Sequence, residues 1–251
     1  MVTFVGAGPG AVDLITVRGK ALLEAADIVI YAGSLVNPDL LGYTKDGCEI
    51  HNSAGMTLEQ VIAVMEQGKK EQKNTVRLHT GDPSIYGAIR EQMDMLAERG
   101  IEYTVVPGVS SFCGAAAALK AEYTLPEVSQ TVILTRMEGR TPVPQKEEIS
   151  KLASHQASMA LFLSSSLLEE LSSKLIEGGY RSNTPAAIVY KATWPDEKIV
   201  KTCVGELQSA AKENNISKTA LILVGDFLGN NYDRSKLYDP AFTHEFREAS
   251  K

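Results

Sequence analysis

The stretch Leu78–Gly87, LHTGDPSIYG, decides which fold this chain can adopt. Residues 75–79 predict a strand, and residues 85–97 predict a helix. A Gly-Asp-Pro turn between them places backbone amides and a carboxylate at the carboxyl edge of a parallel sheet, where α/β proteins bind ligands. Gly81 allows a ligand to approach the backbone closely, and Asp82 can accept a hydrogen bond or face a positive charge. An Asp82 that only caps the turn is the structural alternative.

Two further predicted strands end in the same kind of turn. Residues 2–5 run into Gly-Ala-Gly-Pro-Gly, with Thr16 as the cap of the next helix, and residues 103–106 run into Pro-Gly-Val-Ser-Ser. Additional strands are predicted at 27–31 and 49–50, and a helix ended by Gly68 at 57–67. Three strand-turn-helix units predict an α/β fold with a doubly wound, mostly parallel sheet, and a ligand edge assembled from the turns.

A polar segment with a central proline, EYTLPEVSQ at 122–130, divides the chain. We therefore predict an N-terminal α/β domain over 1–120, a linker over 121–130, a C-terminal α/β domain over 131–236 and a polar tail over 237–251. In the second half the predicted strands are 131–135, 158–163, 186–190 and 219–224, with helices over 167–176 and from 205 onward. These short strands need not all be parallel, which predicts a mixed sheet.

Composition narrows the function classes. A net charge of −6 over 251 residues argues against unspecific attraction to nucleic acid or to an anionic membrane. No apolar run approaches the ~18 residues of a membrane span, and the first residues do not resemble a signal peptide, so a cytoplasmic location is predicted. The three cysteines and four histidines have no spacing typical of a disulfide framework or a metal site, and no bound metal is predicted.

The segment GAGPGA at 6–11 also fits, superficially, the GxGxxG/A fingerprint of nicotinamide dinucleotide binding. In that fingerprint the helix begins within the glycine run, whereas here AVDLI intervenes, and Pro9 has no amide to donate. An NAD-dependent dehydrogenase remains the alternative from this motif.

Several motifs together resemble a known family. They are GAGPG at 6–10, TGDPSIYG at 80–87, VPGVSS at 106–111, LFLS at 161–164, and AIVYKATWPDE at 187–197 followed by GEL. In this order they resemble the tetrapyrrole methylases, class III S-adenosylmethionine-dependent methyltransferases, over nearly the whole chain. ADIVIYAGSLVN at 26–37 and MEGRTPVP at 137–144 resemble, more narrowly, the C11-methyltransferases that act on precorrin-4 in cobalamin synthesis. Relatives that methylate uroporphyrinogen have an aspartate where this chain has Ala32.

The resemblance implies two α/β domains with S-adenosylmethionine in a cleft between them, S-adenosylhomocysteine as product, and a homodimer. It also implies donor contacts, which motif by motif fall on Pro9, Thr80, Gly81, Asp82, Ile85, Ser110, Ser111, Leu163 and Ala192. The implied acceptor is a tetrapyrrole with carboxylate arms, which calls for a local basic rim. Cations near these loops include Arg77 and Arg90, but Arg136, Arg140 and Lys191 are favoured. Methyl transfer needs alignment more than a covalent intermediate, and the catalytic residue is left unassigned.

Other functions remain open at this point. Within the family, the chain could methylate uroporphyrinogen or another precorrin, or a modified protein or ribosomal RNA. Outside methyl transfer, a dehydrogenase would bind NADH, and a non-catalytic carrier would bind the tetrapyrrole without turnover. The sequence does not decide whether the substrate contains cobalt.

Overall fold

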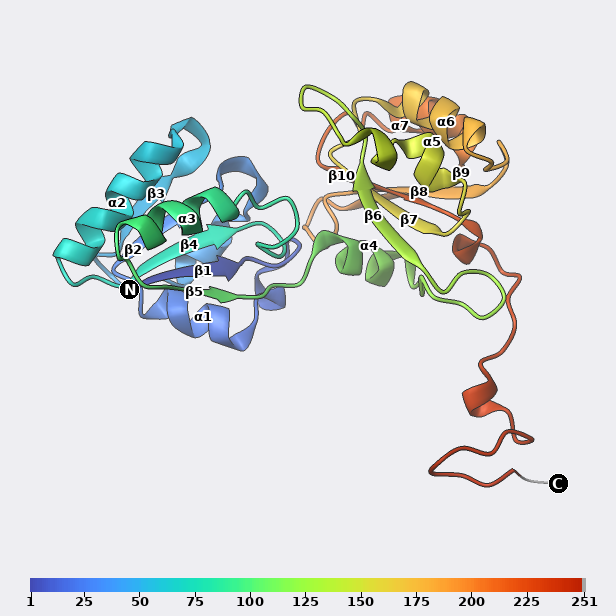
Figure 1. The fold of residues 1–251 in the computed structure, drawn as a ribbon, viewed down its shortest axis with the longest axis horizontal. Helices are drawn as coiled ribbons and strands as arrows, with labels where there is room; N and C mark the ends of the chain where they lie inside the picture. Colours follow the sequence, from blue (N-terminus) through green and yellow to red (C-terminus); the bar gives the residue numbers. More distant parts are fainter. Residues whose placement is uncertain (250–251) are drawn as a thin grey trace. The chain divides into compact units, whose positions relative to one another are not determined.

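The computed structural model describes residues 1–249, which divide into two compact units (Figure 1). The first unit contains Met1–Gly114 and, much later in the chain, Ala192–Asp196. The second contains Ala115–Lys191 and the chain from Glu197 onward. The division falls within helix α4 (Ser111–Leu119), and the predicted boundary after residue 120 lies one residue past the end of that helix.

The first unit is built on a five-stranded parallel sheet, which confirms the predicted sheet type. The strand order is β3-β2-β4-β1-β5. The strands are β1 (Val2–Gly6), β2 (Ile28–Tyr31), β3 (Glu49–Asn52), β4 (Thr75–His79) and β5 (Tyr103–Val106). Gly6 is level with His79, and Val5 is level with Val106. The turns that follow β1, β4 and β5 therefore emerge side by side at one edge of the sheet.

Helices cover both faces of this sheet (Figure 1). Helix α1 (Val17–Glu24) packs on one face, whereas α2 (Leu58–Lys70) and α3 (Arg90–Glu98) pack on the other. Successive residues of each strand point to opposite faces, so Val5 joins the core under α1 and Phe4 joins the core under α2 and α3. Both faces of the central strands are buried, including the polar Thr75, Arg77 and His79 of β4, so the alternation of polar and apolar residues in β4 does not mark a solvent-exposed face.

Two predicted helix boundaries were wrong, for different physical reasons. Gly68 does not end α2 but lies within it, packed so closely that a Cβ atom would be 2.6 Å from the hydroxyl of Thr75. Helix α3 does not begin at residue 85, because Tyr86 and Ala88 have φ angles of 55° and 48°, outside the helical region. The residues between the Gly-Asp-Pro turn and Arg90 form a separate, tight loop.

The second unit contains a mixed five-stranded sheet, as predicted, in the order β6-β7-β10-β8-β9. Its strands are β6 (Val132–Arg136), β7 (Ser158–Phe162), β8 (Pro185–Tyr190), β9 (Lys198–Cys203) and β10 (Ala220–Val224). Only β6 and β7 are parallel. Helices α5 (Ile149–Ala153), α6 (Leu168–Glu177) and α7 (Leu207–Glu213) contribute to its main apolar core. Edge strand β9 and helix α5 were not predicted.

The chain after Gly229 leads away from the second sheet (Figure 1). Although this segment was predicted to be polar, Tyr238 and Phe246 expose 83% and 86% of their surface. Among residues 1–249, no helix combines the length and the apolar character needed to span a bilayer.

Candidate active site

The turns after β1, β4 and β5 meet through three glycines, Gly6, Gly81 and Gly108. A Cβ atom on Gly108 would lie 2.1 Å from the carbonyl oxygen of Gly81 and 2.7 Å from the Cα atom of Gly6. A Cβ atom on Gly6 would lie 2.5 Å from the Cα atom of Gly108. Since no side chain fits here, main chain packs against main chain. The backbone groups of the three turns are consequently closely spaced at this edge of the sheet.

A short antiparallel bridge joins the first and second of these turns. The Gly81 amide donates to the Gly8 carbonyl at 2.9 Å, and the Gly8 amide donates to the Gly81 carbonyl at 3.3 Å. Gly8 and Gly81 have φ angles of 79° and 59°, which glycine adopts without steric cost. The two glycines are therefore required by backbone conformation, and the bridge sets the path of the loop that leads to Asp82.

Asp82 fastens the turn after β4 to the turn after β5. Its Oδ2 accepts a hydrogen bond from the Gly108 amide at 2.9 Å, and its Oδ1 accepts from the Ser84 amide at 2.8 Å and from the Ser84 hydroxyl. Partial burial acts to raise the pKa of the carboxyl, but these hydrogen bonds outweigh it and leave the pKa below its usual value. Asp82 thus shapes the loop as an anion, with both carboxylate oxygens already bonded.

The loop after β2 is connected to the same edge. Asn37, which is buried, donates from Nδ2 to the Gly10 carbonyl at 2.9 Å and accepts from the Asp39 amide at 3.0 Å. The Thr80 hydroxyl donates to the carbonyl of Leu35. The loop after β2 is therefore hydrogen-bonded to the first loop and to the turn after β4.

Residues 192–196 return from the second half of the chain to the first loop. The Trp194 indole donates to the Pro9 carbonyl at 3.2 Å, and the Ala11 amide donates to the Thr193 hydroxyl at 3.0 Å. Gly10 has no room for a side chain, because a Cβ atom would lie 2.1 Å from the Trp194 ring. Thr193 has a φ angle of 70°, which is unusual for a β-branched residue and marks a constrained segment. Ala192 and Pro9, far apart in the sequence, are thereby brought into one unit.

Two residues of β4 are not on the rim of the site. Arg77, one of the cations near the predicted loops, is only 6% exposed, so it cannot serve as a solvent-facing cation. His79 is 3% exposed and stacks on Phe4 with ring centroids 6.0 Å apart. Burial, with the nearby Arg77 charge, lowers the pKa of His79 from 6.5 to about 3, so the ring is neutral at physiological pH.

Four of the predicted site residues belong to the second unit. Leu163 follows β7 with a φ angle of 51° and exposes 65% of its surface, an unusual combination for a leucine. The Arg136 guanidinium donates to three carbonyls of its own loop, those of residues 137, 141 and 142, at 2.7–3.2 Å. Arg140 is exposed in that loop, and the Lys191 ammonium lies 5.4 Å from the ring centroid of Tyr190.

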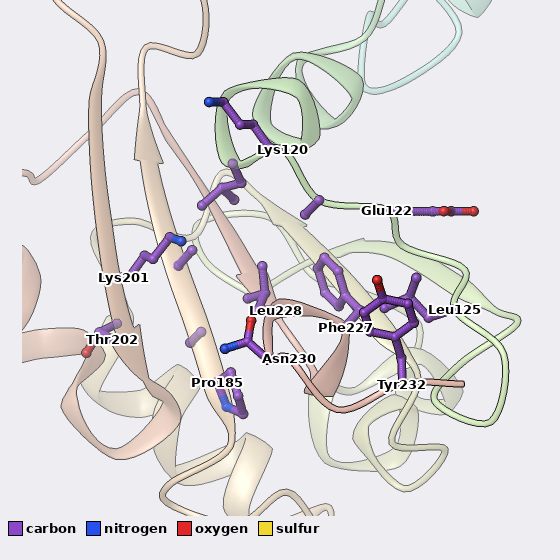
Figure 2. Close-up of a pocket in the computed structure, with 15 residues that line it drawn as sticks. Lys120, Glu122, Leu125, Pro185, Lys201, Thr202, Phe227, Leu228, Asn230 and Tyr232 are labelled. Carbon is purple, nitrogen blue, oxygen red and sulfur yellow. The ribbon is translucent and has the colours of Figure 1, made fainter. Parts of the chain in front are cut away.

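The second unit also has a pocket of its own, with a volume of about 490 Å³ (Figure 2). Leu125, Phe227 and Leu228 contribute apolar surface, and Lys120 and Lys201 contribute cationic side chains. No residue predicted to bind the donor or the acceptor lines this pocket. It is distinct from the glycine-rich edge of the first unit.

Comparison with known proteins identifies the family of this chain. The family model described as Tetrapyrrole (Corrin/Porphyrin) Methylases matches residues 1–208. The chain is a tetrapyrrole methylase. This identification confirms the resemblance found in the sequence motifs.

The relatives of this tetrapyrrole methylase match over nearly its full length. It is 55% identical to the cobalt-precorrin-4 C(11)-methyltransferase of Methanocaldococcus jannaschii, over 100% of this chain and 97% of the relative. It is 42% identical to the precorrin-4 C(11)-methyltransferase of a Sinorhizobium species, over 98% of both chains.

Solved structures agree with the fold. The X-ray structure of a cobalamin biosynthetic enzyme, cobalt precorrin-4 methyltransferase, superposes with a TM-score of 0.89 at 51% identity, covering 91% of this chain and 96% of the other. A uroporphyrin-III C-methyl transferase from Thermus thermophilus, solved with S-adenyl homocysteine, gives a TM-score of 0.75 at 22% identity, covering 90% and 92%. At that identity the second match speaks for the fold alone.

All predicted donor contacts of the methylase except Leu163 lie in its first unit. Asn37, Thr193 and Trp194 were not singled out as site residues, although they hold the first loop in place. The sequence did contain a signal for Trp194, because it is the only tryptophan and precedes a proline. Asn37 also precedes a proline, Pro38, but its partner Gly10 is 27 residues away in the chain, so the contact between them could not be found from the sequence.

Proposed function

We propose that this tetrapyrrole methylase transfers a methyl group from S-adenosylmethionine to C11 of precorrin-4 or cobalt-precorrin-4 in cobalamin biosynthesis. The observation that carries the proposal is the 55% identity, over the entire chain, to a protein named for that reaction. Such identity over full length is hard to reconcile with a dehydrogenase or with a carrier that turns nothing over.

The residues of the first unit fit a sulfonium nucleoside donor. The adenine, the ribose and the amino acid end of such a donor are recognised by amides, carbonyls and hydroxyls. At this edge of the sheet, the three abutting glycines provide main-chain groups rather than side chains. Pro9, Thr80, Gly81, Ile85, Ser110, Ser111 and Ala192 are the proposed contacts there, with Leu163 from the second unit. Asp82 supports the contact loop, since both of its carboxylate oxygens already accept hydrogen bonds.

In this reaction the protein acts mainly by placement. When bound, the donor supplies an electrophilic methyl group on sulfur. The loops tied together by Asp82, Asn37 and the Gly8–Gly81 bridge fix the donor-facing backbone before binding, so little ordering remains to be done during the reaction. His79 is buried and neutral, and it stacks on Phe4 within the core, so we assign it a structural role rather than that of a proton acceptor.

The carboxylate arms of the acceptor require cations. Arg136 already donates to three carbonyls and therefore organises the loop at 137–142. Arg140, exposed in the same loop, is the leading candidate for the acceptor, followed by Lys191.

Between the two substrates, we favour the cobalt-containing one. The relative named for cobalt-precorrin-4 is 55% identical to this chain, whereas the relative named for precorrin-4 is 42% identical. Homodimer formation, implied by the family resemblance, and a cytoplasmic location, predicted from the sequence, remain predictions.

The test is direct. The purified protein is incubated with S-adenosylmethionine labelled in the methyl group and, separately, with uroporphyrinogen, precorrin-4 and cobalt-precorrin-4, and the label is located by NMR. We expect label at C11, with the higher kcat/KM for the cobalt-containing substrate. Label on uroporphyrinogen, or label at another carbon, would refute the assignment within the family.

A further inference from the structure

An arginine is buried in the first unit without an acidic partner. Arg77 lies on β4 and is 6% exposed, and no aspartate or glutamate within residues 1–249 forms an ion pair with it. Burial lowers its pKa from the ordinary value of a guanidinium to about 10, so it remains charged at neutral pH. Removing a guanidinium from water is costly, and an apolar residue would fill this strand position without that cost. A buried cation in this place therefore needs an explanation beyond core packing.

The hydrogen bonds of Arg77 lead to the loop that precedes α3. Its Nε donates to Oε1 of Gln92 at 3.1 Å, and its Nη1 donates to the Ile30 carbonyl at 3.2 Å. Gln92, itself 5% exposed, donates from Nε2 to the Ala88 carbonyl at 2.9 Å. Because a guanidinium can only donate, it fixes the amide oxygen of Gln92 toward itself and leaves the amide nitrogen for Ala88. The charge of Arg77 thus determines which way the Gln92 amide points.

The loop held by this chain of hydrogen bonds is strained. Tyr86 and Ala88 have φ angles of 55° and 48°, and between them Gly87 packs so tightly that a Cβ atom would lie 2.1 Å from the Pro83 carbonyl oxygen. Left-handed conformations at non-glycine residues persist only where surrounding contacts impose them. Ala88 is exposed, so side-chain packing does not impose its conformation. The hydrogen bond that Gln92 donates to the Ala88 carbonyl holds it instead.

The strained loop has an anchor at each end. At its start, Asp82 is bonded to the Gly108 amide, and at its end, Ala88 is bonded to Gln92. Ile85, a proposed donor contact, and Tyr86, which is 46% exposed, lie between these anchors. We propose that Arg77 and Gln92 are positioning residues of the donor site, which hold the Ile85–Tyr86 turn in the conformation that receives S-adenosylmethionine. This inference rests on the proposed function, because it takes Ile85 as a donor contact.

The decisive variant is the double substitution Arg77→Met/Gln92→Leu. It removes both polar groups and fills their volume, so no buried charge is left unpaired and the fold is retained. We expect the Kd for S-adenosylhomocysteine, measured by calorimetry, to rise about tenfold. The KM for the donor should rise in parallel while the KM for the tetrapyrrole stays unchanged, a split that a general loss of stability would not produce.

Two single variants separate positioning from packing. Gln92→Glu keeps a hydrogen-bond acceptor for Arg77, but its carboxylate cannot donate a hydrogen bond to the Ala88 carbonyl. We therefore expect the same loss of affinity for S-adenosylhomocysteine without loss of thermal stability. Thr75→Val is the matched control, because Thr75 lies on the same face of β4, is 2% exposed, and has a hydroxyl without a hydrogen-bond partner. It should bind S-adenosylhomocysteine as the wild type does.

The outcomes are distinguishable from those of the proposed function. A wild-type protein that binds no S-adenosylhomocysteine would refute the proposed donor, whatever the variants do. If the wild type binds it and both the double variant and Gln92→Glu bind it equally well, Arg77 and Gln92 have no positioning role. If the double variant fails to fold, Gln92→Glu decides alone.

Discussion

Replacing Gly108 by alanine tests whether backbone contact between three strand ends builds the donor site. The new Cβ atom would lie 2.1 Å from the Gly81 carbonyl oxygen and 2.7 Å from the Gly6 Cα atom, whereas real Cβ contacts essentially never fall under 3.0 Å. The Gly81 carbonyl must therefore recede by about 1 Å, in a core that relaxes poorly. Both neighbours are backbone atoms, so no side chain can rotate away.

The expected cost follows from this geometry. Overpacking against rigid backbone costs about 3 kcal/mol, which lowers Tm by roughly 6–12 °C for a protein of this size. Displacement of Gly81 also disturbs its hydrogen bonds with Gly8, so the Kd for S-adenosylhomocysteine should rise at least tenfold, or ~1.4 kcal/mol. Differential scanning calorimetry and titration calorimetry measure the two effects.

The matched control is Gly55→Ala. A Cβ atom on Gly55 meets nothing within 4 Å, and its backbone is not left-handed. We expect Tm within about 2 °C of the wild type, or slightly higher because alanine restricts the unfolded chain. If Gly108→Ala behaves like Gly55→Ala in both assays, the three strand ends do not pack as described and the account of the donor site is wrong.

Three further predictions address the other anchors of the site. The pKa of Asp82 lies below its usual value in the folded protein, so the carboxylate contributes stability that is complete above pH ~5 and is lost as the pH falls through that lowered pKa. The variant Asp82→Asn weakens the hydrogen bond to the Gly108 amide. In urea titrations, the difference in unfolding free energy between wild type and Asp82→Asn should therefore be constant above pH ~5 and shrink below pH ~4. Leu163→Ala should change the free energy of unfolding by less than ~0.5 kcal/mol yet weaken S-adenosylhomocysteine binding several-fold, whereas Leu161→Ala, at 0% exposure in the same segment, should cost about 3 kcal/mol; equal stability losses would place Leu163 in the core. Arg140→Ala should raise the KM for the tetrapyrrole without changing donor affinity, and unchanged acceptor kinetics would remove Arg140 from the acceptor site.

Much of the first sheet could be predicted because its evidence is local. The bounds of β4 and β5 agree with the predicted strands at 75–79 and 103–106, and Thr16 caps α1 as its position before the helix indicated. Buried parallel strands appear as apolar runs, and caps appear as single polar residues next to them, so both can be found without knowing what lies across the fold.

Predictions failed where a residue type has more than one structural use. Glycine often follows the end of a helix, but Gly68 is required inside α2 because Thr75 packs against it. An arginine near a ligand loop suggests an anion site, but Arg77 points into the core and bonds Gln92 and Ile30. In both cases the deciding neighbour lies on another helix or strand, so the pattern within the element itself does not reveal it.

By itself, the sequence determined the class of fold and the family, because glycine-rich turns and apolar strands act over a few residues; the residues that hold the methyl donor remain a prediction. Tertiary structure alone decided that Asp82 bonds Gly108, that Asn37 holds Gly10, and that Trp194 returns to Pro9. Each of these contacts joins residues that are 26 to 185 positions apart. Which hydrogen-bond donor meets which hydrogen-bond acceptor over such separations depends on how the strands are ordered in the sheet. That order is a property of the whole packed unit.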